Sequence, residues 1–297
     1  MLNNFFLNLL LVSTIFGYSV FDHIRDTKIP SSNFISSYDS NINLYNFSNP
    51  ACNSKNNQYL YSDFGSHFDG ILNTQQFLFN LNTKLLNNLN IALLRSSIDD
   101  INNTSDAWDD NGDGIINQGE IDYDKISTFN HNTLGLILSK PFNKNNFQLG
   151  INSKLSITNL AEEHSFSSGF DFGVYQSFKN FDFGLVIKDI LSYNYWTTGT
   201  IDNNESSIIL GSSFQINAIN IGLDLNPIAS EYFIAFEYNY DSLVSFYCSN
   251  STFEKIHLGL LINFEKFNIG YSFSVPEFEQ LGITQKITLG INKKYFK

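Results

Sequence analysis

An alternation of apolar and polar residues, which begins near residue 58 and recurs to the end of the chain, constrains the fold most strongly. In the stretch 219–226, for example, Ile and Leu residues alternate with Asn, Gly and Asp. The same pattern recurs in 147–152, 181–188, 256–264, 267–273 and 287–291. A period of two is that of a β-strand with one apolar face. A soluble β-sandwich shows the same alternation, so the period alone does not separate a sandwich from a membrane barrel.

The links between the alternating stretches favour a barrel. We predict fourteen strands, at 58–64, 74–82, 89–97, 127–139, 147–157, 168–177, 181–189, 206–216, 219–226, 231–240, 243–249, 255–264, 267–275 and 283–293. Short turns follow most even-numbered strands, whereas the long links 98–126, 158–167 and 190–205 follow odd-numbered ones. This contrast is typical of a bacterial outer-membrane barrel, whose long loops lie outside the cell. The even strand number predicts that both chain ends lie on the periplasmic side.

Few charges and many aromatic residues also suit a protein surrounded by lipid. Charged residues make up 15% of the 297 residues, and aromatic residues make up another 15%. Beyond the N-terminus, no apolar run approaches the roughly 18 residues that a membrane helix needs. We therefore predict an all-β transmembrane antiparallel barrel over 58–297, with its apolar face towards lipid and its polar, glycine-containing face towards the lumen. The net charge of −12 argues against nucleic acid as a partner.

Residues 1–19 are predicted to be a signal peptide. They contain an apolar core that is too short to span a bilayer, followed by the small residues Gly17 and Ser19 near the expected cleavage point. The alternative is a hydrophobic N-terminal helix buried in the fold. Export makes the bacterial outer membrane the expected location.

Residues 20–57 lack the alternation and are rich in Ser and Asn. We predict that they form a hatch or plug in the periplasmic mouth of the barrel, with Asn49, Pro50 and Ala51 as its motif. A disordered leader is the alternative. Cys52 and Cys248 are expected to stay unpaired, although export would permit one disulfide.

The sharpest local motif lies in the longest predicted external loop, 98–126. It matches the twelve-residue calcium loop at every ligand position, with Asp109, Asn111, Asp113, the Ile115 carbonyl, Asn117 and Glu120 as the expected ligands. Oxygen ligands at this spacing wrap one Ca²⁺ ion. The residues that follow suggest loop and then strand, without the paired helices of a calcium sensor. We expect a structural Ca²⁺ that rigidifies the loop; the alternative is an Asn-, Asp- and Gly-rich loop that matches by chance.

Motifs for catalysis are missing from the sequence. Asp-Phe-Gly occurs three times, but no kinase glycine loop or catalytic loop accompanies it. The chain also lacks a Gly-x-Ser-x-Gly elbow, a His-Glu-x-x-His motif and a cysteine cluster. We predict that the protein is not an enzyme. Charges predicted on the lumen face are expected to pair with one another or with the plug, and a conduction path is the alternative; they are Lys154, Asp171, Asp182, Lys188 and Asp224.

In order along the chain, several short pieces resemble the PorV/PorQ family, a branch of the FadL-like fourteen-stranded outer-membrane barrels. They are Ser48-Asn49-Pro50-Ala51, Asp63-Phe64-Gly65-Ser66-His67-Phe68, Gly119-Glu120-Ile121-Asp122-Tyr123-Asp124-Lys125-Ile126, Lys188-Asp189-Ile190, Tyr195-Trp196-Thr197-Thr198-Gly199 and Leu281-Gly282-Ile283-Thr284-Gln285-Lys286-Ile287-Thr288-Leu289. The chain departs from the family ahead of Asn49, where a Gly/Ala-rich stretch is replaced by residues such as Asn33, Phe34 and Tyr38. The resemblance implies a non-catalytic role in type IX secretion, with secreted cargo bearing C-terminal sorting domains, or secretion-machinery subunits, as partners.

Three functions compete. The first is a secretion-associated barrel that binds cargo through its external loops, and it predicts a blocked lumen. The second is a FadL-like transporter of hydrophobic compounds, and it predicts an apolar site inside the barrel and a gap in the wall. The third is a structural barrel in outer-membrane lipid. The mostly polar residues predicted for the lumen favour the first.

Overall fold

The computed structural model describes residues 47–52, 59–81, 88–107, 121–144, 147–241 and 243–292. The predicted signal peptide and the calcium-loop residues from Asp109 to Glu120 lie outside these ranges, and only 47–52 of the predicted hatch is described. None of the helices in the described ranges is long and apolar enough to cross a membrane.

The described residues form fifteen β-strands and three short 3₁₀ helices. The strands are β1 (Tyr59–His67), β2 (Leu72–Leu81), β3 (Leu89–Asn103), β4 (Ser127–Lys144), β5 (Phe147–Leu160), β6 (Glu163–Phe178), β7 (Phe181–Trp196), β8 (Ile201–Asn203), β9 (Ser207–Ile216), β10 (Ile219–Asn226), β11 (Glu231–Tyr240), β12 (Val244–Ser251), β13 (Glu254–Asn263), β14 (Phe267–Pro276) and β15 (Thr284–Asn292). The 3₁₀ helices are η2 (Phe68–Gly70), η4 (Tyr123–Lys125) and η5 (Glu279–Leu281).

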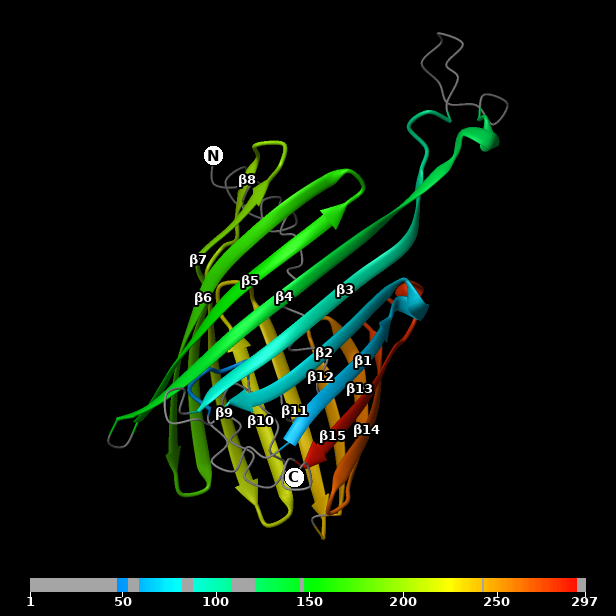
Figure 1. Ribbon diagram of the computed structural model, residues 1–297. Coiled ribbons are helices and arrows are strands. Elements are labelled where there is room, and N and C mark those ends of the chain that lie inside the picture. The colour runs from blue at the N-terminus through cyan, green and yellow to red at the C-terminus, as the bar shows by residue number, and fades with distance from the viewer. Residues whose placement is uncertain are drawn as a thin grey trace, which may run out of the picture.

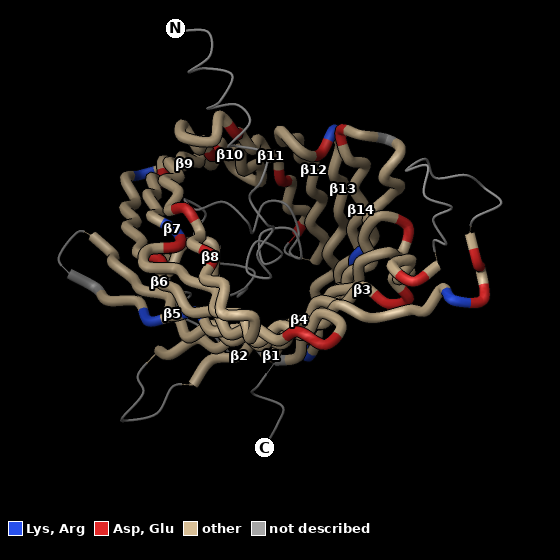
Figure 2. Tube along the Cα trace, turned by 90° about the horizontal axis from the view of Figure 1, so that it is seen from above, with Lys and Arg blue, Asp and Glu red and all other residues tan. Residues whose placement is uncertain are grey.

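Strand pairing closes the sheet into a barrel, as Figures 1 and 2 show from the side and from above. Each strand pairs antiparallel with its neighbours, β1 pairs with β15, and β6 pairs with β7. The three-residue strand β8 pairs with β7 and adds to its external end. The ring therefore contains fourteen strands, the fifteen less β8, which confirms the predicted architecture. A closed ladder satisfies the backbone hydrogen bonds that lipid cannot satisfy.

The alternation of side chains matches the two faces of the wall. On β11, Ile234 and Phe236 are exposed on the outside, whereas Ala235 and Glu237 are buried in the lumen. The same arrangement holds around the ring, where the exposed large residues are mostly Phe, Ile, Leu and Tyr and the buried polar residues mostly face inwards. An apolar outer belt around a polar interior is the pattern of a barrel in a membrane.

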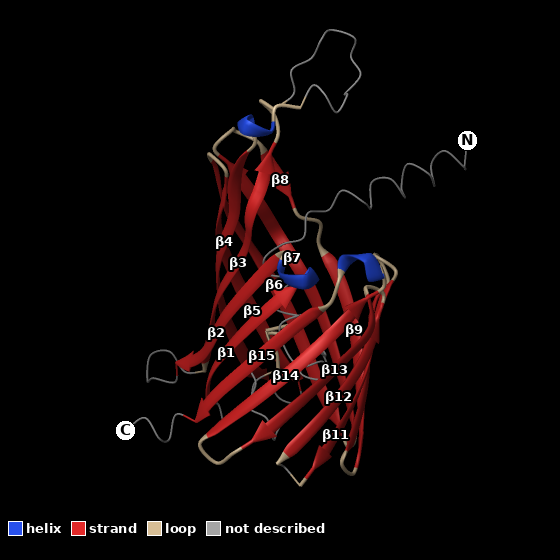
Figure 3. Ribbon diagram, turned by 90° about the vertical axis from the view of Figure 1, so that its right-hand side faces the viewer, coloured by secondary structure: helices blue, strands red, loops and turns tan. Residues whose placement is uncertain are grey.

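The wall is much taller on one side than on the other (Figures 1 and 3). Strands β3 to β7 have 14 to 18 residues, whereas strands β9 to β15 have 8 to 10. The predicted loops 158–167 and 190–205 were therefore wrong in large part, because β5, β6 and β7 continue through them, and β3 continues to Asn103. The outer face of these extensions mixes exposed polar residues such as Asn159 and His164 with exposed apolar ones such as Phe166 and Tyr195, so the alternation fades while the backbone ladder goes on.

Candidate functional site

Two neighbouring glycines on the wall, which we call the glycine shelf, leave room for the hatch residues 47–52 inside the barrel. Gly150 of β5 and Gly173 of β6 are direct cross-strand partners. A Cβ atom on Gly150 would overlap the Pro50 backbone, and one on Gly173 would overlap the Asn49 side chain. The apolar-Gly-apolar triplet at 149–151 thus has a specific reason here, since the hatch backbone rests where a side chain would otherwise stand.

Side-chain hydrogen bonds fold the predicted hatch motif into a tight turn and fix it to the wall. The Asn49 Oδ1 atom accepts a hydrogen bond from the Ala51 amide at 3.0 Å, and the Cys52 amide donates to the Asn49 carbonyl at 3.0 Å. The Asn49 Nδ2 atom donates to the Val174 carbonyl of β6 at 3.1 Å. Asn and Pro are residues that favour such turns. The structure therefore places Asn49, Pro50 and Ala51 against β5 and β6.

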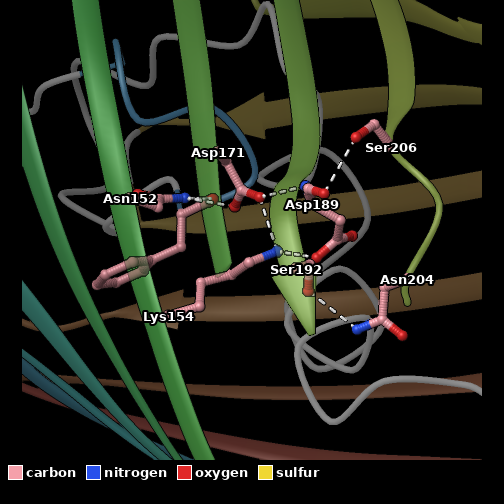
Figure 4. A network of polar contacts seen from close by, with 8 residues as sticks. Asn152, Lys154, Asp171, Asp189, Ser192, Asn204 and Ser206 are labelled. Atoms are coloured by element: carbon pink, nitrogen blue, oxygen red, sulfur yellow. Dashed lines mark hydrogen bonds and ion pairs between the residues drawn. The ribbon is translucent and has the colours of Figure 1, made fainter. Parts of the chain in front are cut away.

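Next to the hatch, a buried charge cluster joins three strands (Figure 4). The Lys154 Nζ atom of β5 lies 2.7 Å from the Asp171 carboxylate of β6 and 2.5 Å from the Asp189 carboxylate of β7. The Asn152 Nδ2 atom donates both to Asp171, at 3.1 Å, and to the Phe47 carbonyl of the hatch, at 2.9 Å. Pairing of this kind is what makes buried charges tolerable. Two of the predicted lumen charges, Lys154 and Asp171, do pair as expected.

The charge cluster sits at an irregularity in β7. The register between β6 and β7 shifts twice, between Ser168 and Phe170 and between Phe170 and Phe172, so β7 carries extra residues there. Asp189 and Leu191 have positive φ angles of 57° and 51°, which L-residues other than Asn and Asp adopt rarely. Two consecutive β-bulges account for this geometry.

The bulged part of β7 lacks an ordinary ladder on its other side. Pairing with β9 ends at Lys188, and pairing with β8 begins at Tyr193. The connection from β8 to β9 spans the interval (Figure 4): Asn204 bonds to Ser192 through both its amide and its side chain, each at 3.0 Å, and the Ser206 hydroxyl donates to the Asp189 carbonyl at 3.1 Å. Sequence reasoning missed this irregularity. Its signal was the polar pair Lys188-Asp189, which interrupts the alternation.

A second missed feature is an apolar layer inside the lumen. One cluster of buried residues combines the hatch with walls on both sides of the barrel; its members are Phe47, Tyr61, Leu78, Ala92, Leu94, Ile137, Tyr247 and Leu261. Ile137 on β4 and Tyr247 on β12 are seven strands apart in a ring of fourteen, so the layer crosses the lumen. The buried residues of the lumen are mostly polar, as expected, and this layer is the apolar exception among them.

The remaining predicted sites are placed only in part. No group of His, Cys, Asp and Glu residues within the described ranges is arranged to hold a metal ion. The base of the long external loop is closed, because the Asp122 amide donates to the Ala107 carbonyl at 2.8 Å. Cys52 is buried in the hatch and Cys248 is exposed, and no disulfide joins them, as expected.

Comparison with known proteins connects this geometry to barrels of solved structure. The P. putida toluene transporter TodX has a TM-score of 0.54 and 12% identity, over 89% of this chain and 97% of TodX. The CymD monoaromatic hydrocarbon channel has a TM-score of 0.47 and 9% identity, over 89% and 97% of the two chains. The Acinetobacter baumannii outer membrane protein Omp33 has a TM-score of 0.41 and 10% identity, over 80% and 98%. No family model matches this chain, and no curated protein matches it.

At 12% identity, the likeness to TodX is a likeness of fold. Together with the closed ladder and the exposed apolar belt, it decides where the chain resides. The protein is a multi-pass β-barrel of the bacterial outer membrane. Its fold is similar to that of TodX, whereas the FadL-like and the narrower PorV/PorQ assignments stay predictions from the sequence pieces.

Proposed function

We propose that the barrel carries hydrophobic compounds across the outer membrane, the reading that the sequence left as an alternative. The apolar layer in the lumen carries this proposal. A water-filled pore keeps a polar interior, and an apolar layer that crosses the lumen disfavours water and ions. Small apolar ligands bind in sites lined mainly by hydrophobic and aromatic side chains.

The bulged segment of β7 is the proposed weak point in the wall. Over Asp189–Ser192, the regular ladder with the next strand is replaced by a few bonds from Asn204 and Ser206. Each such bond contributes a net stabilisation of about 0.5–1.5 kcal/mol. Opening this interval therefore requires far less free energy than separating two fully paired strands. TodX, whose fold is similar to that of this chain, is a toluene transporter, which agrees with passage of apolar molecules.

The test is the uptake of toluene into outer-membrane vesicles that contain the protein. Leu261→Asn introduces a polar amide into the apolar layer, where Leu261 is fully buried. Burying an unpaired amide costs about 1–3 kcal/mol, so water is drawn into the layer and uptake is expected to slow at least about fivefold. Thr288→Asn, at another buried position on the lumen face, is the matched control. Equal uptake by the two variants would contradict the proposal.

A role in type IX secretion is the second candidate, and one observation favours it. Two of the pieces that resemble the PorV/PorQ family, 188–190 and 195–199, lie on or just beyond β7, on the tall external side. There the Trp196 Nε1 atom donates to Asp202 at 2.7 Å and the His164 amide donates to Thr197 at 3.1 Å, which makes this end rigid. Recovery of proteins with C-terminal sorting domains in a mild-detergent pull-down would support the secretion role. A partner-free barrel would remove it.

We also propose that Asp109, Asn111, Asp113, Ile115, Asn117 and Glu120 hold a structural Ca²⁺ ion. The proposal rests on the spacing of these residues in the sequence. The bond between Asp122 and Ala107 supports it, because it brings together the two ends of the segment that contains the motif. Ca²⁺ would rigidify the link between β3 and β4.

A further inference from the structure

The short side of the barrel ends externally in hairpins that present large apolar residues. We call this edge the low rim and define it by Ile71, Ile228, Phe253 and Phe278, in the links β1–β2, β10–β11, β12–β13 and β14–β15. Their side chains are 62%, 62%, 64% and 71% exposed. External loops are ordinarily polar surface segments. Four apolar tips along one edge therefore indicate an apolar environment that covers them.

Strand length points to the membrane as that environment. Strands tilted by about 40° advance roughly 2.5 Å along the barrel axis per residue. The eight residues of β10 and of β12 therefore cover about 20 Å, less than the apolar belt of about 25 Å. The hairpin tips supply the missing height, which places them within the belt and not above it.

The strand register gives an independent measure of height. One row of cross-strand partners runs from Ile287 of β15 through β1 to β5 and reaches Phe166 of β6. At this tilt each of its six steps climbs about 3 Å, so Phe166 stands roughly 18 Å above Ile287. Ile287 lies three residues, or about 8 Å, below Thr284, where β15 begins externally. The exposed apolar side chain of Phe166 thus stands about 10 Å above the low end of the wall.

We propose that the low rim is seated in the outer leaflet, in contact with lipid acyl chains, so that the external mouth opens on this side at the level of the hydrocarbon. A flat bilayer that covers Phe166 on the tall side also covers Phe253 and Phe278 on the short side. Charged residues beside the tips, such as Lys255 and Glu277, reach the headgroup region with their polar ends.

The low rim is held together between its first and last hairpins. The Asp69 amide donates to the Ile283 carbonyl at 3.0 Å, and the Ile283 amide donates to the Asp69 carboxylate at 3.0 Å. These bonds join η2 to the β14–β15 link across the closure of the barrel. For the transport function proposed above, on which this consequence rests, an apolar compound dissolved in the outer leaflet enters over the low rim without first entering water.

Tryptophan quenching in lipid vesicles tests whether the low rim contacts lipid acyl chains. Phe253→Trp and Phe278→Trp are made separately in a full-length Trp108→Phe/Trp196→Phe background and reconstituted in phosphatidylcholine vesicles with brominated acyl chains. We expect strong quenching by the brominated lipid and weak quenching by aqueous iodide. The matched control is Tyr123→Trp, in η4 between β3 and β4. Tyr123 is 63% exposed, and the opposite pattern is expected there.

Iodide quenching at Phe253→Trp and Phe278→Trp equal to that at Tyr123→Trp would overturn the proposal. Phe267→Trp, at an exposed position on the outer face of β14, reports full lipid contact and shows that the vesicles are properly loaded. The outcome is separate from transport. If uptake is lost but brominated lipid still quenches the low-rim tryptophans, only the transport function is contradicted. If iodide quenches them, the lipid contact of the low rim is contradicted, whether or not uptake occurs.

Discussion

Replacing Gly150 by Ala should release the hatch from the wall while leaving the barrel intact. The added methyl group meets the Pro50 backbone, which has no flexible end that can move aside. Strand β5 is paired on both sides, with β4 and β6, so the hatch is the part that yields. An Ala in a strand is otherwise favourable relative to Gly, and the barrel itself should not lose stability.

The size of the effect follows from the bonds that hold the hatch. Its displacement breaks the bond from Asn49 to Val174 and the bond from Asn152 to Phe47. At about 0.5–1.5 kcal/mol each, their loss weakens hatch binding by about 1–3 kcal/mol. This corresponds to a roughly 5- to 150-fold larger population of released hatch.

Amide hydrogen exchange, followed by mass spectrometry in detergent, measures that population in 47–52. Exchange there should accelerate by this factor in Gly150→Ala, and exchange in β11 should not change. Gly65→Ala is the control, because its methyl group faces the side chains of Thr74 and His67 and not the hatch. Equal exchange of 47–52 in the two variants would refute the argument that the glycine shelf holds the hatch.

Three further predictions concern stability. Lys154→Met removes the ion-pair partner of the buried Asp171 carboxylate and of the partly buried Asp189 carboxylate, and should lower the free energy of unfolding by about 3–5 kcal/mol in urea titrations, whereas Lys125→Met, in a solvent-exposed pair, should cost less than about 1 kcal/mol. Glu120→Gln should make the 98–126 loop more sensitive to protease in calcium; no change with either this variant or a chelator would remove the Ca²⁺ proposal. Unboiled protein should migrate differently from boiled protein on a detergent gel, and identical mobility would count against a closed barrel.

The sequence predicted the barrel well because the relevant information is local. The phase of the alternation, as in 219–226, assigns each side chain to lipid or lumen without knowledge of any partner. The upper parts of β5, β6 and β7 escaped detection because their outer face mixes polar residues such as Asn159 and His164 with apolar ones such as Phe166 and Tyr195. Their hydrogen bonds depend on neighbouring strands, and a single stretch of sequence does not reveal those neighbours.

The site was predictable only in fragments. The glycine at 150 was expected on the lumen face, but its contact with Pro50 joins positions a hundred residues apart. The apolar layer did leave a local signal, since Leu78, Ile137 and Leu261 each lie in the middle of three consecutive apolar residues. Such runs indicate strands covered on both faces. The bulges at Asp189 and Leu191 were visible only as a break in the period.

A reversible disulfide across the bulged interval of β7 tests the transport account most directly. Ser192→Cys/Asn204→Cys, in a Cys52→Ala/Cys248→Ser background, links two positions that already share a backbone hydrogen bond. The control pair is Tyr193→Cys/Asn203→Cys, at cross-strand partners in the regular β7–β8 ladder. The account predicts that oxidation stops toluene uptake by the first pair, that reduction restores it, and that the control pair is unaffected. Undiminished uptake by the oxidised first pair would contradict passage through the wall at β7.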